Sequence, residues 1–299
     1  MNVFEVKPQG YCGGVRQAIQ KAIDCRKAYP DQKITVLGNL VHNQYVKKAL
    51  EQLDIQTVEN SQRTRLELLD DIPEGIVIFT AHGVHPDVRI KARDKGLIVV
   101  DASCPFVVQT QAIVSQKLKE GYDVFYIGKY KHPEAESIYL LSDHVHLIQS
   151  EKDICDIKAD RIFVTNQTTM SIYEIDSLFR AIHAKYPNAQ IHDEICNATR
   201  VRQQAVRNLD PNQIDALIVV GDPSSNNTRK LAATAWESGI RTVIKVQNVQ
   251  ELNIDDLKGA QNVAVTSGAS TPGYLTKQIL RFLTDDSHQK EEICIDHIL

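Results

Sequence analysis

VFEVKPQGYCGGVRQAI, residues 3–19, has the pattern of a short apolar strand, a loop that carries Cys12 and the start of a helix. Apolar residues recur in the helical part at Val15, Ala18 and Ile19, which is the spacing of one helix face. A cysteine at a strand-to-helix junction projects from the carboxyl edge of a sheet, where open α/β folds bind ligands. The segment therefore predicts a fold class and a place to look for function.

Two further cysteines occupy the same kind of junction. Cys104 follows the apolar run LIVV and precedes FVVQTQAIVSQKL, and Cys196 follows QIHDEI and precedes a helical stretch. The intervals from Cys12 to Cys104 and from Cys104 to Cys196 are both 92 residues. Equal spacing within similar surroundings indicates an internal repeat.

Two other elements recur once in each repeat. Apolar strands end in glycine and a polar loop in ITVLGNLVHN (34–43), VFYIGKYKHPE (124–134) and ALIVVGDPSSNN (216–227). Apolar strands end in threonine and a small polar loop in IVIFTAHGV (76–84), RIFVTNQTT (161–169) and NVAVTSGAST (262–271). Strands that alternate with helical stretches of this length favour parallel sheets.

The repeat predicts an α/β fold of three pseudo-threefold-related α/β units with small, mostly parallel sheets around a centre where cysteines and polar loops meet. We place these repeats at residues 14–101, 102–192 and 193–283, the last together with the N-terminal strand 1–13. That strand is expected to pair with the last repeat. Residues 284–299 are expected to form a charged, frayed tail.

Composition narrows the function classes. The 299 residues are 42% hydrophobic and 24% charged, as in ordinary globular proteins. The net charge of −4 and the scattered basic residues indicate no nucleic-acid partner. No apolar run is long enough for a membrane span, and the N-terminus lacks the pattern of a secretory signal, so we expect a cytoplasmic protein that binds small molecules or proteins.

The three repeat cysteines favour a metal centre. Three thiolates are one fewer than an ordinary [4Fe–4S] cluster takes, so one iron would stay open for a substrate oxygen. One alternative is that the cysteines pack as small hydrophobic residues, and another is zinc with His132 as fourth ligand. The remaining cysteines, Cys25, Cys155 and Cys294, match no repeat position and are interpreted as core or surface thiols.

The repeated polar loops favour an anionic ligand, because imidazoles, hydroxyls, amides and helix N-terminal amides hold phosphate groups. Taken singly, each such residue is weak evidence, because a loop histidine or serine is more often solvated or part of a turn. The loop residues are His42, Asn43, His82, His132, Glu134, Thr168, Thr169, Ser224, Ser225, Asn226, Asn227, Ser270 and Thr271.

Glu134 is the carboxylate of this set that follows a His-Pro turn, and it has two interpretations. It is either a proton donor in a donor-lined pocket or a glutamate favoured by a helix N-terminus. Three histidines, His85, His144 and His146, fit no repeat position and are expected to be structural or exposed to solvent.

Nine segments, in order, carry a family resemblance: GYCGGVRQAI, LGNLVHN, AHGV, DASCP, HPEAES, NQTT, EICNAT, SSNNTRKL and TSGASTP. Together they resemble the LytB/IspH family of 4-hydroxy-3-methylbut-2-enyl diphosphate reductases, from Cys12 to Ser270. The resemblance implies a three-domain cloverleaf with one [4Fe–4S] cluster per chain on Cys12, Cys104 and Cys196. It also implies diphosphate binding by His42, His82, Ser224, Ser225, Asn226 and Ser270.

The resemblance further implies a reaction. His132 is expected near the diphosphate and the proton path, and Thr168 and Glu134 near the substrate hydroxyl. The allylic alcohol would bind the open iron, two electrons would enter through the cluster, and Glu134 would help to deliver a proton as water leaves. Protonation at either end of the allyl anion-like fragment gives isopentenyl or dimethylallyl diphosphate. Reduced ferredoxin or flavodoxin is the expected electron donor.

Two segments depart from the common family pattern. GKYKHPE carries Lys129, Tyr130 and Lys131 where many relatives have a histidine, and DASCP replaces DATCP. Neither change touches an expected ligand. Two other functions compatible with the residues are a non-catalytic iron–sulfur sensor or electron carrier, which does not need Glu134, and a zinc or metal-free diphosphate-binding protein.

Overall fold

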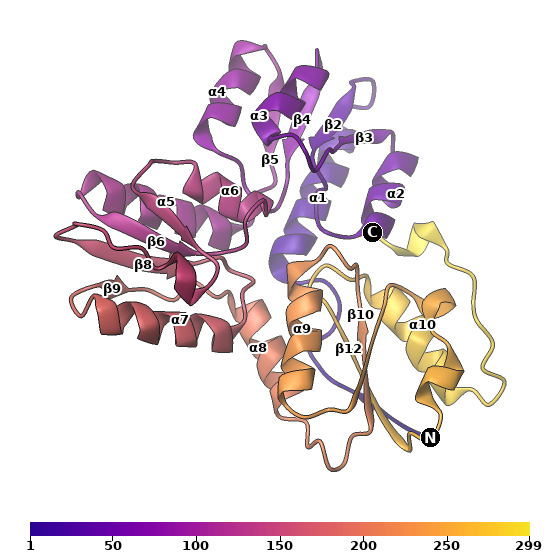
Figure 1. Cartoon of the computed structure of the whole chain (residues 1–299). Helices are drawn as coiled ribbons and strands as arrows, with labels where there is room; N and C mark the ends of the chain where they lie inside the picture. Colours follow the sequence, from indigo (N-terminus) through magenta and orange to yellow (C-terminus); the bar gives the residue numbers. More distant parts are fainter. The chain divides into compact units, whose positions relative to one another are not determined.

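Twelve strands form three sheets of four in the computed structural model, which describes residues 1–299 (Figure 1). All strand pairs in these sheets are parallel. The chain divides into two compact units. Unit 1 consists of Met1–Arg16, His42–Ala49 and Asn197–Leu299, and unit 2 consists of Gln17–Val41 and Leu50–Cys196.

The first sheet of unit 2 has the strand order β3-β2-β4-β5. Its central strands are fully buried, as expected for parallel strands covered on both faces. The strands are β2 (Ile34–Leu37), β3 (Ile55–Val58), β4 (Ile76–Phe79) and β5 (Ile98–Asp101). The helices of this stretch are α1 (Gly13–Ala28) and α2 (Gln44–Gln52), which both begin in unit 1, α3 (Arg65–Leu68), the 3₁₀ turn η1 (Leu69–Asp71) and α4 (Pro86–Asp94).

The second sheet of unit 2 has the order β7-β6-β8-β9. Apolar clusters lie around β6 and β8 and include Phe125, Val124 and Val164. The strands are β6 (Asp123–Ile127), β7 (Val145–Ile148), β8 (Ile162–Asn166) and β9 (Gln190–Ile191). The helices are α5 (Pro105–Lys119), α6 (Pro133–Tyr139), η2 (Glu151–Asp153) and α7 (Ile172–Lys185).

The sheet of unit 1 has the order β11-β10-β12-β1. Its strands are β1 (Asn2–Glu5), β10 (Ala216–Val220), β11 (Thr242–Val246) and β12 (Asn262–Ser267). The helices are α8 (Asn197–Arg207), α9 (Asn226–Glu237) and α10 (Gly273–Thr284), with the 3₁₀ turns η3 (Val249–Glu251), η4 (Ile254–Leu257) and η5 (Ile295–His297). The two apolar clusters of this unit divide between alternate residues of β10, with Ile218 in one and Leu217 in the other.

The three sheets repeat one strand order, which confirms the predicted α/β class. In each sheet the strand before a repeat cysteine pairs with the strand before a threonine loop: β1 with β12, β5 with β4, and β9 with β8. The predicted pairing of the N-terminal strand with the last repeat is confirmed. The boundaries 14–101, 102–192, 193–283 and 284–299 remain a prediction.

The expectation of a frayed C-terminal tail was wrong. Ile298 is only 2% exposed, and the chain before it makes hydrogen bonds and an ion pair with α10. The acidic and basic residues that suggested a solvated tail include partners for charges on α10, such as Glu291 for Arg281. Figure 1 shows this segment in yellow.

None of the ten α-helices combines the length and the hydropathy needed to cross a lipid bilayer.

Gly38, in the loop after β2, provides a test of this packing. It has φ +96°, and a Cβ atom there would overlap the guanidinium group of the buried Arg65, which pairs with Glu59. We expect Gly38→Ala to destabilise the protein by about 3 kcal/mol or more, because backbone strain adds to the displacement of a buried guanidinium. Chemical unfolding would measure the loss.

Gly96 gives the matched control for Gly38. It also has positive φ, +72°, but no atom lies within 4 Å of the position that a Cβ atom would take there. Gly96→Ala should therefore cost only about 1 kcal/mol from backbone strain. Equal losses in the two variants would contradict the role assigned to Arg65.

Candidate active site

The three repeat cysteines have the same backbone anchor. Each immediately precedes a helix: Cys12 precedes α1, Cys104 precedes α5, and Cys196 precedes α8. Their amides donate to the carbonyls of Ala269 (2.9 Å), Ala81 (3.0 Å) and Thr168 (3.1 Å), respectively. All three acceptors belong to the threonine loops, so each cysteine is fixed to the loop that follows the neighbouring strand.

The side chains of these cysteines lie at the surface of their units rather than in the core. All three are partly exposed, whereas Cys25 is 5% exposed. No disulfide bond links any of the six cysteines. Partial exposure argues against the alternative in which the repeat cysteines pack as hydrophobic residues, and the helix N-terminus behind each one favours a negatively charged ligand sulfur.

Cys12 has a further contact that suits a ligand thiolate. The amide of Val15, in the first turn of α1, donates to its Sγ at 3.5 Å. Cys12 belongs to unit 1, whereas Cys104 and Cys196 belong to unit 2. Within either unit, no three histidine, cysteine, aspartate or glutamate side chains form a group that could hold a metal ion. The formation of a three-cysteine centre stays a prediction.

Unit 2 joins Glu134 to Cys196 through one residue. Oε1 of Glu134 accepts the amide of Thr168 at 2.7 Å, and the Thr168 hydroxyl also bonds to this carboxyl group. The carbonyl of the same Thr168 accepts the amide of Cys196. Glu134 and Thr168 are 2% and 4% exposed, so both predicted residues lie in one buried polar group.

Burial sets the protonation of Glu134. It raises the pKa of this carboxyl group from 4.5 to about 7, against the opposing effect of the two hydrogen bonds from Thr168. The carboxyl group therefore changes protonation near neutral pH, which is the property of a general acid. This observation favours the proton-donor interpretation over a purely structural glutamate at the start of α6.

His132 contacts the backbone of Glu134, and His82 contacts His132. His132 is the N-cap of α6, and its Nδ1 accepts the amide of Glu134 at 3.2 Å. That bond assigns the proton of a neutral His132 ring to Nε2. The ring of His82 meets the ring of His132 edge-on, with centroids 5.6 Å apart. Since His82 follows Ala81, the anchor of Cys104, the polar group continues toward that cysteine.

Unit 1 collects the other predicted residues. The hydroxyl of Ser270 donates to the carbonyl of His42 at 2.9 Å, which joins two of them directly. Ser225 is the N-cap of α9 and accepts the amide of Thr228, while Asn226 begins the helix and is 4% exposed. Ser224 is exposed, and its hydroxyl donates to Asp222 at 2.6 Å.

Two residues of the wider loop set make structural hydrogen bonds. Asn43 accepts the amides of Tyr45 and Val46 and so caps α2. Asn227 accepts the amide of Ala269 and donates to Thr199, which ties the Cys12 anchor to α8.

Two residues near the candidate site were missed by the sequence analysis. Asp222 organises its loop by accepting the amide of Gln44 as well as the Ser224 hydroxyl. Tyr126 is fully buried on β6, and burial together with the charges of Glu134 and Glu194 raises the pKa of its phenol well above its usual value. A tyrosine within the apolar run VFYI was the available signal for Tyr126.

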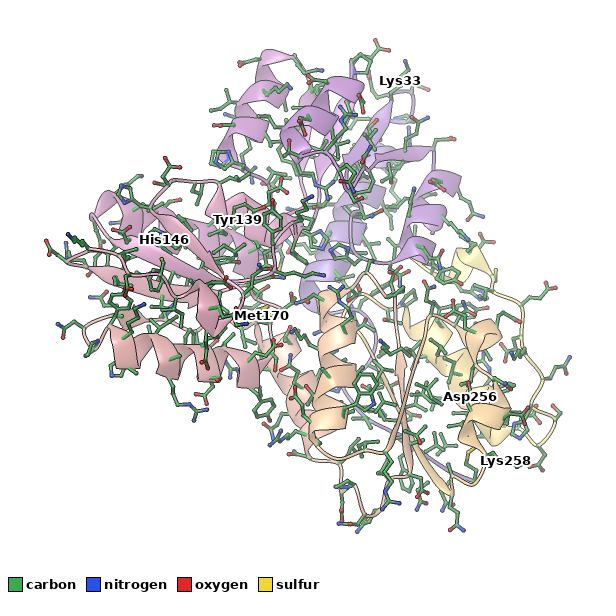
Figure 2. The ribbon with its side chains drawn as sticks, viewed as in Figure 1. Lys33, Tyr139, His146, Met170, Asp256 and Lys258 are labelled. Carbon is green, nitrogen blue, oxygen red and sulfur yellow. The ribbon has the colours of Figure 1, made fainter.

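His85, His144 and His146, which fit no repeat position, are structural or exposed, as predicted. His85 caps α4 through Nδ1. His144 and His146 both contact Asp123, at 3.2 and 2.9 Å, and the side chain of His144 is 71% exposed. Figure 2 labels His146 on β7, and Met170 in the loop after β8.

Glu134 makes stability depend on pH. Its pKa is about 7 in the folded chain against 4.5 for an unperturbed group, so the folded state binds the proton more tightly. The free energy of unfolding should therefore fall by about 3 kcal/mol as pH rises from below 4.5 to above 7. Glu134→Gln removes this loss, so its stability relative to the unchanged protein should improve with rising pH.

Chemical unfolding of both proteins at pH 5 and pH 8 checks this prediction. The sign is specific, because an ordinary ion-paired carboxylate would make the substitution more costly at high pH. A stability difference that is the same at both pH values would contradict the raised pKa of Glu134.

The fold and the site together define a class of protein: a parallel α/β protein of three like sheets, with a cysteine at the same junction of each repeat and buried acid and imidazole groups in the intervening loops. The sequence model of the LytB protein family matches residues 3–284. The chain belongs to the LytB family.

Named relatives agree with this assignment. A protein of Brevibacillus brevis called 4-hydroxy-3-methylbut-2-enyl diphosphate reductase is 46% identical over 287 residues, covering 95% of this chain and 91% of the relative. A Bacillus subtilis protein of the same name is 42% identical, with coverage of 97% and 92%.

Solved structures extend the comparison to the fold. The E-1-hydroxy-2-methyl-but-2-enyl-4-diphosphate reductase of Plasmodium falciparum matches with a TM-score of 0.89 and 30% identity, over 97% of this chain and 90% of that one. A second structure, of (E)-4-hydroxy-3-methyl-but-2-enyl diphosphate reductase, the terminal enzyme of the non-mevalonate pathway, matches with a TM-score of 0.64 and 28% identity. It covers 94% of this chain and 98% of that one.

Proposed function

We propose that this chain reduces 4-hydroxy-3-methylbut-2-enyl diphosphate to isopentenyl diphosphate and dimethylallyl diphosphate, the last step of the non-mevalonate isoprenoid pathway. The reaction takes up two electrons and two protons, breaks the allylic C–O bond and releases water. The names and high coverage of the relatives support this activity. The structural observation that most directly supports this activity is the buried Glu134. Its carboxyl group has a pKa of about 7 and is joined through Thr168 to Cys196.

One [4Fe–4S] cluster per chain is the proposed cofactor, with Cys12, Cys104 and Cys196 as its ligands. Their identical anchors, partial exposure and positions at helix N-termini fit a group that takes thiolate ligands. When bound, the cluster supplies the electrons and one iron without a protein ligand. Zinc on three cysteines and His132 is the competing assignment. It is disfavoured because the Nδ1 atom of His132 already accepts the Glu134 amide, which leaves the ring proton on Nε2 and no free nitrogen lone pair for a metal.

The diphosphate would be held by uncharged donors and helix amides. We assign this role to His42, His82, Ser224, Ser225, Asn226 and Ser270, with His132 between the diphosphate and the proton path. Ser225 and Asn226 are buried at the N-terminus of α9, where backbone amides and the helix dipole favour a phosphate group. The contact between Ser270 and His42 supports a joint role for these two residues.

Proton delivery is assigned to Glu134. Near pH 7 its carboxyl group is partly protonated, so it can donate a proton to the hydroxyl that leaves as water. The Thr168 hydroxyl bonds to the carboxyl group and would orient both it and the substrate oxygen. We assign the Nε2–H of His132 to the diphosphate, because the other ring nitrogen accepts the Glu134 amide.

The physiological setting is also a proposal. Reduced ferredoxin or flavodoxin is the electron donor we expect, and the cytoplasm is the expected compartment. Six cysteines without a disulfide bond suit a reducing environment.

Anaerobic purification followed by iron and sulfide analysis and a turnover assay tests the proposal. We expect about four irons per chain, and consumption of dithionite only when the diphosphate alcohol is present. A colourless protein that holds zinc, or a cluster protein that never turns over the alcohol, would refute it.

A further inference from the structure

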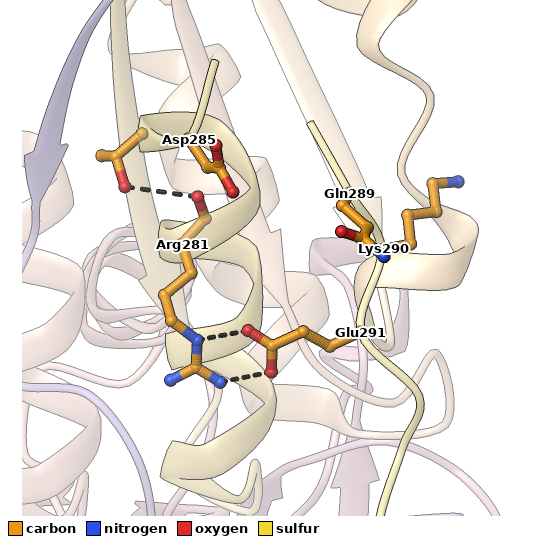
Figure 3. A pocket seen from close by; sticks show the side chains of 6 residues that line it. Arg281, Asp285, Gln289, Lys290 and Glu291 are labelled. Carbon is orange, nitrogen blue, oxygen red and sulfur yellow. Dashed lines mark hydrogen bonds and ion pairs between the residues drawn. The ribbon is translucent and has the colours of Figure 1, made fainter. Parts of the chain in front are cut away.

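The last eleven residues, Gln289–Leu299, form an ordered segment that we call the strap. Glu291 makes a bidentate ion pair with Arg281 of α10, in which Nη2 of Arg281 lies 2.6 Å from Oε2 of Glu291 (Figure 3). The carbonyl of Glu292 accepts a hydrogen bond from Nε2 of the Gln278 side chain at 2.9 Å and one from the Tyr274 hydroxyl at 3.2 Å. Successive contacts along one helix therefore fix the path of the strap.

The end of the strap reaches the loop that carries Cys12. The hydroxyl of Tyr11 donates to the carbonyl of Ile298 at 2.8 Å, and the side chain of Ile298 is 2% exposed. The ring of His297 meets the ring of Tyr274 edge-on at 5.0 Å.

Tyr11 directly precedes Cys12, and the neighbouring positions are held by other parts of unit 1. The Gly10 amide donates to Ser267 at 2.9 Å, its carbonyl accepts Arg202 at 2.7 Å, and the Cys12 amide donates to Ala269. Tyr11 is the residue through which this loop meets the C-terminus of the chain.

The residues that precede the other two repeat cysteines bond within their own loops. Ser103, before Cys104, bonds through its amide and hydroxyl to Asp101 two residues away. Ile195, before Cys196, donates its amide to Asp193. Tyr11, by contrast, is 287 residues from its partner.

We propose that Tyr11 is a positioning residue that couples the C-terminal strap to the Cys12 loop, so that release of the strap exposes the Cys12 thiol. The coupling is a property of unit 1 and holds with or without a cofactor. Only its consequence for cluster retention rests on the proposed function.

The expected size of the effect of Tyr11→Phe follows from the single hydrogen bond that this substitution removes. A neutral hydrogen bond of this kind corresponds to about a fivefold change in a local opening equilibrium. The loop keeps its anchors at Gly10 and Cys12, so Tyr11→Phe should loosen it without unfolding unit 1. Ile298→Asp places a charge in a buried apolar position and should release the strap end more completely.

Alkylation of the cofactor-free, full-length chain under reducing conditions tests the coupling. With iodoacetamide as probe and peptide mass mapping as readout, Cys12 should react about fivefold faster in Tyr11→Phe, and faster still in Ile298→Asp. The rates at Cys104 and Cys196 should not change. Tyr29→Phe, at a tyrosine outside this contact, should leave the Cys12 rate unchanged.

An unchanged Cys12 rate in Tyr11→Phe overturns the proposal, as does an equal acceleration at all three repeat cysteines. If Ile298→Asp fails to fold, Tyr11→Phe alone decides. In cluster-loaded protein, Tyr11→Phe should also lose its visible absorbance faster in air. A protein that never binds a cluster but shows selective alkylation of Cys12 would refute the proposed function while leaving the coupling intact.

Discussion

Cys196→Ser is expected to yield a chain that folds but retains neither cluster nor turnover. The serine hydroxyl stays protonated near neutral pH and is a poor ligand for iron. Only three protein ligands are proposed for the cluster, so no other cysteine can replace the lost thiolate. The amide of residue 196 can still donate to the Thr168 carbonyl, so the loop should keep its path. Iron analysis and the visible absorption spectrum of anaerobically purified protein measure the loss.

The same result is expected for Cys12→Ser and Cys104→Ser, because the three positions share one backbone geometry. Cys155→Ser is the matched control, since Cys155 is exposed in unit 2 and its contact with Tyr186 is made by the backbone carbonyl. Full iron content in any one of the three repeat variants would contradict the assignment of that residue as a ligand.

Much of the fold could be predicted because the repeated segments include the buried central strands of the sheets. ITVL, VFYI and ALIVV are continuous apolar runs that end in glycine, and a strand buried on both faces permits few other residues. The edge strands give a weaker signal. β3 (IQTV), β7 (VHLI) and β11 (TVIKV) lie at sheet edges and carry polar residues, so the predicted repeat omitted them.

The tail shows why local composition can mislead. HQKEEICIDHIL has the charge density of a solvated terminus, but Glu291 pairs with Arg281 and Ile298 is buried. Both interactions depend on residues brought near by the tertiary fold. No sequence window centred on the tail contains that information.

The candidate site was predictable in residue type but not in its internal order. Glu134 and Thr168 were both chosen as loop residues, yet their hydrogen bond joins positions 34 residues apart. The raised pKa of Glu134 comes from burial, which a His-Pro-Glu turn at a helix start does not reveal. Tyr126 was missed for the same reason, because its burial comes from the tertiary fold and its neighbours in β6 are mostly apolar.

Glu134→Gln is the most direct test of the proposed proton delivery. Glutamine keeps the size of the side chain and an oxygen that can accept the Thr168 amide, but it cannot donate a carboxylic acid proton. We expect kcat to fall by about 10²- to 10⁴-fold with a small change in KM. Anaerobic steady-state kinetics with the diphosphate alcohol and dithionite would measure both constants.

The pH profile separates a chemical role from a structural one. Because the acid form of Glu134 is the active one, kcat of the unchanged protein should fall as pH rises through about 7. The residual activity of Glu134→Gln should lack this descending limb. Glu136→Gln is the matched control, because Glu136 lies on the same helix and is partly buried. This variant should keep kcat within about threefold and retain the limb near pH 7. If Glu134→Gln keeps the profile of the unchanged protein, the proton comes from another group.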